Sequence, residues 1–148
     1  MENWQRFQLV RQLTKTIVLD TAQAGLYEFT DAVREFVAAA KIKTGLLTVF
    51  VQHTSASLLI QENADPEVCC DLERFFQRLV PYGDKLFRHT SEGPDDMPAH
   101  VRAALTAASL SIPIESGKPA LGTWQGIYLY EHRTSPHRRQ VALHLIGE

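Results

Sequence analysis

The sequence has few cysteines, no long apolar run and almost no net charge. Its two cysteines, Cys69 and Cys70, are neighbours, and neighbouring side chains on a helix point about 100° apart. A disulfide between them would therefore need a distorted backbone. We expect both thiols to be reduced and buried, rather than to form a metal or redox pair.

The longest apolar runs, residues 46–51 and 143–146, are far shorter than the roughly 20 residues of a membrane-spanning helix. The N-terminus lacks the basic start and the apolar core of a secretory signal. The net charge of -2 comes from interspersed acidic and basic residues, which give no field strong enough to recruit nucleic acid or an anionic membrane. We therefore expect a cytoplasmic protein, with no nucleic-acid and no membrane partner, that binds small molecules or other copies of itself.

The 148 residues fit a single domain, 1–148, because the chain contains no repeat, no low-complexity stretch and no linker. Apolar spacing and turn residues predict strands interleaved with isolated helices, which is typical of an α+β domain with much antiparallel sheet. The predicted elements are an opening strand within 7–19, a helix over 31–41, a strand over 45–53, a strand over 57–62, a helix from 66 that ends before 81, a short helix from about 97, and strands between 111 and 148.

Two predicted elements carry specific expectations. The strand over 45–53 is mostly apolar and β-branched, so we expect a central strand that is buried on both faces. Asp65 and Pro66 form an N-cap followed by proline at the first helical position. The helix that follows carries one apolar stripe, formed by Val68, Leu72, Phe75, Phe76 and Leu79.

The segment from His53 to Ser57 is the first candidate for a functional site. A histidine leaves the predicted buried strand there and enters a run of small polar residues, where a substrate can approach the backbone. The hydroxyls of Thr54, Ser55 and Ser57 suit phosphate oxygens. The alternative is a hydrogen-bonded core histidine followed by an ordinary turn.

His89 and His100 extend this candidate site. His89 precedes an acidic loop, and His100 lies in the first turn of the short helix, where the helix dipole favours a neutral imidazole that can bind metal. Three histidines from a strand end, a loop and a helix start can form a three-ligand site with an open position for water or substrate. Glu62, Asp95 and Asp96 are candidates to orient the imidazoles or to bind a magnesium-like ion, although the two aspartates could instead only cap the helix.

The segment Gly122-Thr123-Trp124-Gln125-Gly126 places a large aromatic ring and an amide between two glycines. Such a pair could stack on a substrate ring and hydrogen-bond its edge. A tryptophan in a strand is more often part of the core, and the sequence leaves this alternative open.

A basic cluster lies at a predicted turn near the C-terminus and consists of Arg133, His137, Arg138 and Arg139. Guanidinium groups there could hold phosphate through two hydrogen bonds each, whereas solvated charge at a hairpin tip is the common alternative. His132 and His144 occupy strand-like contexts without carboxylate or cysteine companions, so neither is assigned to the site.

Three blocks of this sequence resemble, in order, the signature blocks of the YjbQ family, and the match extends over nearly the whole chain. The blocks are His53-Thr54-Ser55-Ala56 with Glu62, Asp65-Pro66 and Asp71; His89 with Asp95-Asp96 and Ala99-His100; and Gly122-Thr123-Trp124-Gln125, followed by the arginine-bearing hairpin and a terminal strand. The resemblance implies an α+β fold with two mostly antiparallel sheets in a sandwich and about three helices, assembled as a homotrimer. It also implies a site at or near the subunit interface that binds a divalent metal, zinc or magnesium.

Members of this family are named secondary thiamine-phosphate synthases. The resemblance therefore implies a transferase that joins a hydroxymethylpyrimidine diphosphate to a thiazole phosphate and releases pyrophosphate, with the ion and an arginine stabilising the departing pyrophosphate. The candidate residues are Glu62, Asp96, Gln125 and Arg138 for catalysis, Thr54, Ser55, Thr123, Trp124 and Arg139 for substrate binding, and His53, His89 and His100 for the metal.

Two other functions fit the same residues. One is a metal-dependent phosphate-ester hydrolase, with a metal-bound water and Glu62 or Asp96 as the base. The other is a trimeric protein that binds metal or a small ligand and catalyses nothing. Many members of the family carry asparagine where this chain has Asp96, and the added negative charge favours a cation over a bare phosphate if the side chain reaches the site.

Overall fold

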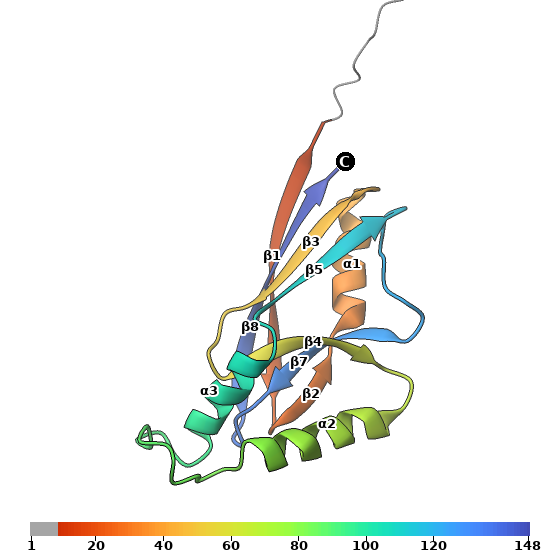
Figure 1. Ribbon diagram of the computed structural model, residues 1–148. Coiled ribbons are helices and arrows are strands. Elements are labelled where there is room, and N and C mark those ends of the chain that lie inside the picture. The colour runs from red at the N-terminus through yellow and green to blue at the C-terminus, as the bar shows by residue number, and fades with distance from the viewer. Residues whose placement is uncertain (1–8) are drawn as a thin grey trace, which may run out of the picture.

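The computed structural model describes residues 9–148, and it contains two antiparallel sheets and three helices (Figure 1). The predicted α+β class with two antiparallel sheets is therefore confirmed. The first two residues of the predicted opening strand, 7 and 8, lie outside the described residues. The five-stranded sheet has the order β1 (Arg11–Thr21), β8 (His137–Gly147), β3 (Gly45–Val51), β5 (Ser109–Glu115) and β6 (Lys118–Pro119), and the three-stranded sheet has the order β2 (Gly25–Glu28), β7 (Gln125–Glu131) and β4 (Ala56–Glu62).

The three helices are α1 (Thr30–Ala40), α2 (Pro66–Leu79) and α3 (Asp96–Leu105). In Figure 1 the five-stranded sheet stands upright with α1 beside it, the three-stranded sheet crosses its lower end, and α2 runs beneath that smaller sheet. The side chains of α1 that face inward, including Val33 and Val37, join one apolar core with the inner faces of both sheets. None of the helices within 9–148 is long and apolar enough to cross a membrane.

Strand β3 occupies the predicted central position, between β8 and β5, but the prediction that both its faces are buried is wrong. Leu47, Val49 and Val51 are buried, whereas Leu46 and Phe50 are 43% and 47% exposed. The cause is that α1 and the smaller sheet cover one face of the large sheet, and an antiparallel sheet can leave its other face to solvent. The apolar composition of β3 therefore serves a core face and an open face.

Helix α2 lies on the surface, and none of its residues is fully buried. Its apolar stripe is only partly covered, since Phe75 and Leu79 are about half exposed. The expectation that both thiols are buried is wrong for the same reason: Cys70 is exposed and Cys69 is partly buried, and both are free of disulfide bonds as predicted.

The two predicted helix starts differ in their capping. Asp65 precedes α2, and its side chain accepts a hydrogen bond from the backbone N–H of Glu67 at 2.9 Å, with Pro66 at the first helical position, so this prediction is confirmed. Asp95 precedes α3 without a side-chain capping bond. The carboxylates of Asp95 and Asp96 instead bind side chains from elsewhere in the chain, and these bonds build the candidate site.

Candidate metal site

Two histidines and one aspartate meet at the start of α3. His89 lies in the loop that leads to this helix, Asp96 is its first residue, and His100 follows one turn later on the same helix face. One oxygen of Asp96, Oδ2, lies 2.7 Å from Nε2 of His89 and 3.1 Å from Nε2 of His100. The three ligand atoms all lie within 4.8 Å of one another, and we name these residues the His89–Asp96–His100 group.

The tautomer of His100 gives this group its chemical character. Its Nδ1 lies 2.9 Å from the backbone carbonyl oxygen of Thr54, which can only accept, so Nδ1 carries a hydrogen. In the neutral ring Nε2 then holds a lone pair, which faces Oδ2 of Asp96 at 3.1 Å. Two acceptors at this distance repel each other unless a proton or a metal ion lies between them.

Arg133, just after β7, holds the other side of the two aspartates. Its Nη1 donates to Oδ1 of Asp96 at 2.8 Å, and its Nε donates to Oδ2 of Asp95 at 3.0 Å. The backbone N–H and the hydroxyl of Thr134 also donate to Oδ2 of Asp95, at 2.9 and 3.1 Å. The turn at 133–134 therefore clamps the start of α3.

Burial and hydrogen bonding act in opposite directions on the two carboxylates. Burial raises the pKa of Asp95, but hydrogen bonds from Thr134 and Arg133 outweigh it and lower the pKa to about 2. Burial also raises the pKa of Asp96, and the hydrogen bond with His89, together with His100 and Arg133, lowers the pKa below its usual range. Both side chains are ionised at neutral pH, and Asp96 gives the group the negative charge that a cation needs.

His53 does not join this group. Its Nε2 accepts a hydrogen bond from the backbone N–H of Gln140 at 2.8 Å, which uses the lone pair that a metal would need. Burial, followed by the nearby charge of Arg139, lowers the pKa of His53 and keeps the ring neutral. Of the three histidines predicted as ligands, the structure brings together His89 and His100, and it places Asp96 between them instead of His53.

The residues predicted to hold phosphate are engaged with protein partners. Arg139 is buried and forms an ion pair with Glu131, and it also donates to Oγ of Ser55 at 2.9 Å. Arg138 points to the opposite side of β8 and forms an exposed ion pair with Asp20. Thr54 contributes its backbone carbonyl oxygen, to His100.

Four predicted residues lie at the other end of the three-stranded sheet. Glu62 and Gln125 are paired across β4 and β7, and Thr123 and Trp124 precede β7. Six residue steps along β4 separate Glu62 from Ala56, or about 20 Å at the usual rise of a strand. Within one chain these residues therefore cannot serve the same ion as the His89–Asp96–His100 group.

The segment from Gly122 to Gly126 has a structural explanation. The side-chain oxygen of Gln125 accepts from the backbone N–H of Gly122 at 2.7 Å, which closes a turn. A Cβ atom on Gly126 would lie 2.7 Å from a carboxylate oxygen of Glu28 and 3.0 Å from side-chain carbons of Asn63 and Tyr128, so a larger residue would have to displace these side chains. Trp124 is 62% exposed and forms no part of the core.

Sequence reasoning missed the roles of Arg133 and Thr134. Arg133 was recognised only as one cation of the basic cluster and received no partner. The available signal was charge complementarity, because the acidic segment 92–96 and the basic segment 133–139 have opposite signs. Sequence alone does not indicate which cation meets which carboxylate across 37 residues.

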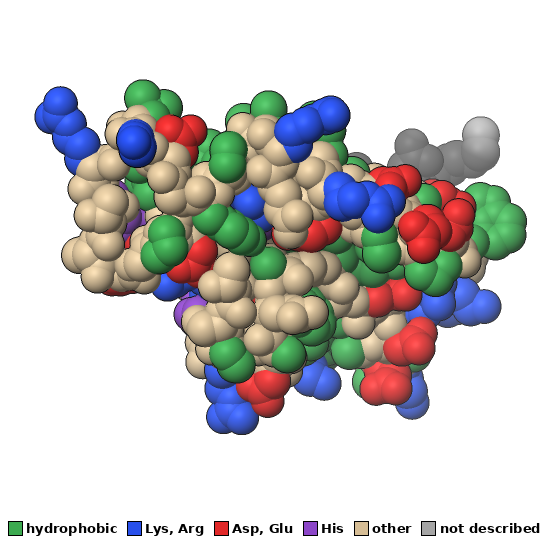
Figure 2. Space-filling model, turned by 90° about the horizontal axis from the view of Figure 1, so that it is seen from below, with side chains coloured by type: hydrophobic (Ala, Val, Ile, Leu, Met, Phe, Trp, Pro, Cys, Tyr) green, Lys and Arg blue, Asp and Glu red, His purple; other side chains and the backbone are tan. Residues whose placement is uncertain are grey.

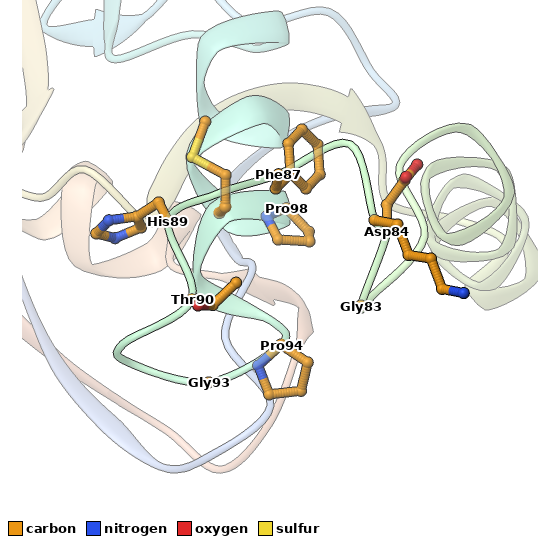
Figure 3. A pocket seen from close by; sticks show the side chains of 10 residues that line it. Gly83, Asp84, Phe87, His89, Thr90, Gly93, Pro94 and Pro98 are labelled. Atoms are coloured by element: carbon orange, nitrogen blue, oxygen red, sulfur yellow. The ribbon is translucent and has the colours of Figure 1, made fainter.

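A pocket of 390 Å³ adjoins the group and is lined by the loop from Gly83 to Pro94 and by Met97 and Pro98 of α3. His89 belongs to its lining, but Figure 3 shows the imidazole at the rim, pointing away from Phe87 and Pro98. The ring therefore serves the His89–Asp96–His100 group rather than the pocket. On the face seen in Figure 2, acidic, basic and hydrophobic side chains are intermixed, in agreement with the interspersed charges of the sequence.

The fold and the site define a small α+β protein with a candidate cation site of two histidines and one carboxylate. The family model described as UPF0047 protein YjbQ-like matches residues 15–148, and the chain belongs to this family. UPF0047 protein sll1880 from Synechocystis is 52% identical over 138 residues, which cover 93% of this chain and 94% of that protein. UPF0047 protein YjbQ from Escherichia coli O157:H7 is 42% identical, covering 90% of this chain and 97% of that protein.

Solved structures agree with the fold. A protein of the YjbQ/UPF0047 family from Clostridium acetobutylicum matches with a TM-score of 0.79 and 36% identity, covering 87% of this chain and 97% of its own. A YbjQ-like protein of unknown function from Sulfolobus solfataricus matches with a TM-score of 0.86, covering 95% of this chain and 100% of its own. At 24% identity, the second likeness supports the fold alone.

Proposed function

We propose that the protein is a divalent-cation-dependent enzyme that acts on a phosphorylated small molecule, with the cation held by His89, Asp96 and His100. The observation that carries the proposal is the position of His100: its Nε2 faces Oδ2 of the ionised Asp96 at 3.1 Å, while its Nδ1 is bound to the carbonyl oxygen of Thr54. A cation placed between these atoms turns a repulsive contact into two bonds. The same oxygen also faces Nε2 of His89, so one ion can reach all three ligands.

The dimensions of the group suit such an ion. Metal–ligand distances of about 2.0–2.1 Å in a tetrahedral site place neighbouring ligand atoms about 3.3 Å apart. The present separations from Oδ2 of Asp96, 2.7 Å to His89 and 3.1 Å to His100, would widen by about 0.6 and 0.2 Å to reach this value. Three protein ligands leave at least one position for water or substrate, which is the arrangement of catalytic rather than structural sites.

The cation would also supply the charge that binds phosphate. The arginines predicted for this task are paired with Glu131 and Asp20, and Arg133 is occupied by Asp95 and Asp96. A bound ion acts as a Lewis acid on a phosphoryl oxygen and lowers the pKa of its water. Hydrolysis of a phosphate ester needs only these two effects, so a single chain has the parts for it.

Thiamine-phosphate synthesis is the second candidate, and it makes a larger demand. The residues expected to hold the ring, Thr123, Trp124 and Gln125, lie at the Glu62 end of β4, about 20 Å along that strand from its Ala56 end. Synthesis therefore needs a second copy of the chain to bring its exposed Trp124 to the ion. The expected homotrimer offers such an arrangement.

The test starts with the metal content of protein purified without an affinity tag, measured by plasma mass spectrometry. We expect near-stoichiometric metal in the wild type and in His53→Ala, and loss of the metal in His89→Ala, Asp96→Ala and His100→Ala. His53→Ala is the matched control, because this histidine lies outside the group. A wild type without metal, even after incubation with Zn²⁺, Co²⁺, Mn²⁺ or Mg²⁺, would contradict the proposal.

Activity assays on the metal-loaded protein then separate the candidate reactions. Phosphate release from a generic ester indicates the hydrolase, and pyrophosphate release that requires both hydroxymethylpyrimidine diphosphate and thiazole phosphate indicates the synthase. Metal binding without turnover of either kind would leave a cation-binding protein that is not an enzyme for these substrates.

A further inference from the structure

Arg133 determines which oxygen of Asp96 is free to bind an ion. The guanidinium Nη1 donates to Oδ1 at 2.8 Å, so that Oδ2 alone faces the two imidazoles. The side chain of Asp96 is 2% exposed and that of Arg133 is 13% exposed, so water competes little for this bond. The carboxylate is therefore oriented before any ion arrives.

Arg133 is itself held in place from several directions. Its backbone N–H donates to Oε1 of Glu131 at 3.0 Å, and Glu131 is fully buried against Arg139. Its Nε and Nη2 donate to Oδ2 of Asp95 and to the backbone carbonyl of Glu92, both at 3.0 Å. A planar guanidinium with several fixed acceptors has a single orientation available.

We infer that Arg133 is a positioning residue that holds Asp96 as a one-oxygen ligand and thereby makes the site selective for a first-row transition cation over Mg²⁺ and Ca²⁺. The inference rests on the proposed cation site. It concerns the class of cation and the residue that sets it, rather than the presence of the ion.

The ligand set explains this selectivity. Two imidazoles and one carboxylate oxygen suit Zn²⁺, Co²⁺, Ni²⁺ and Fe²⁺, whereas Mg²⁺ and Ca²⁺ prefer oxygen ligands and Ca²⁺ accepts carboxylates through both oxygens. While Arg133 occupies Oδ1, Asp96 offers one oxygen only. Removal of the guanidinium frees Oδ1, adds uncompensated negative charge from Asp95 and Asp96, and shifts the balance toward hard cations.

The experiment is a titration of the metal-free protein with Co²⁺, followed by its visible absorption bands, which report the number and geometry of its ligands. The variants are Arg133→Met, which removes the charge, and Arg133→Lys, which retains it without the fork of donors. Arg138→Met is the matched control, because Arg138 belongs to the same basic cluster but forms only an exposed pair with Asp20. Each protein is also titrated with Co²⁺ in the presence of excess Mg²⁺ or Ca²⁺.

We expect Arg133→Met to bind Co²⁺ about 10–100-fold more weakly than the wild type, with changed bands at saturation and stronger competition from Mg²⁺ and Ca²⁺. Arg133→Lys should restore part of the affinity, and Arg138→Met should equal the wild type. A purely structural role for Arg133 would lower the melting temperature but leave the saturated spectrum unchanged.

The outcomes separate the inference from the proposed function. If the wild type itself binds no Co²⁺, the cation site is wrong. If the wild type binds Co²⁺ and Arg133→Met gives the same affinity, spectrum and competition, only the inference about Arg133 is overturned. If Arg133→Met does not fold, Arg133→Lys is judged by the same criteria. A wild-type spectrum and wild-type selectivity in Arg133→Lys would overturn the inference that the several donors of the guanidinium are required.

Discussion

All six histidines lie within the described residues 9–148, and among them only His132 is fully buried. Its Nε2 lies 2.9 Å from Oγ of Ser57, and its ring packs against Tyr130 with centroids 4.3 Å apart. Burial, followed by the charge of Arg102, lowers the pKa of His132 to about 3. The ring therefore stays neutral in the folded protein over a range in which a histidine of the unfolded chain takes up a proton.

The buried His132 should make the protein sensitive to acid. Its pKa is lower in the folded state than the ordinary value of 6.5, so between pH 6.5 and about 3 the unfolded chain binds one proton more. The contribution of the neutral His132 to the free energy of unfolding is fully present above pH 6.5. It is lost as the pH falls from 6.5 to about 3. We expect His132→Gln to reduce the slope by about 1.4 kcal/mol per pH unit within it.

Urea denaturation of both proteins over this pH range measures the slopes. At neutral pH the ring is neutral in both the folded and the unfolded state. The difference between the two proteins in free energy of unfolding there gives the packing cost of the substitution and serves as the control. Equal slopes would mean that His132 takes up a proton without unfolding.

Arg138 and Arg139 illustrate what sequence can and cannot indicate at the residue scale. Both were predicted to hold a phosphorylated ligand, and adjacent positions of β8 point to opposite faces. Arg139 therefore turns inward to the buried Glu131, and Arg138 turns outward to Asp20. The residue types were informative about charge, but the partners are 8 and 118 positions away and only the fold assigns them.

Local periodicity predicted the elements well because it depends on near neighbours. The predicted helices over 31–41 and from 66 and the strand over 57–62 agree closely with α1, α2 and β4. The open face of β3 was not predictable in the same way. Whether the second face of a strand is buried depends on which other elements cover it, and the residues of the strand itself do not indicate this.

The start of α2 is a feature of one element that can be tested alone. The side chain of Asp65 satisfies the N–H of Glu67, which otherwise has no partner within the helix. We expect Asp65→Ala to lower the free energy of unfolding by about 1 kcal/mol, and Asp65→Asn, which keeps an acceptor oxygen, to retain most of the stability. Urea denaturation followed by circular dichroism measures both, and an equal loss in the two variants would assign the effect to charge rather than to capping.

The large sheet gives the whole molecule an open face with apolar side chains. Leu46 of β3 pairs directly with Ile146 of β8, and they are 43% and 38% exposed. Phe50 of β3 and Val18 of β1 add apolar surface at 47% and 49% exposure. Clustered exposed apolar side chains on adjacent strands are typical of a surface that another protein covers.

A homotrimer that uses this face is our prediction for the assembly. Light scattering coupled to size-exclusion chromatography should give a mass three times the 16.7 kDa of one chain. Phe50→Glu should release monomers, because burial of an unpaired carboxylate in an apolar interface costs more than the contacts return. Phe75→Glu is the matched control, since Phe75 is also 47% exposed but belongs to α2, outside the large sheet.

The same measurement connects assembly to chemistry. If synthesis of thiamine phosphate needs Trp124 of one copy beside the His89–Asp96–His100 group of another, Phe50→Glu monomers should retain bound metal but lose synthesis. Hydrolysis of a phosphate ester, which needs one chain, should survive in the same monomers. A Phe50→Glu protein that remains trimeric, beside a Phe75→Glu protein that dissociates, would place the interface at α2 and contradict the role of the open sheet.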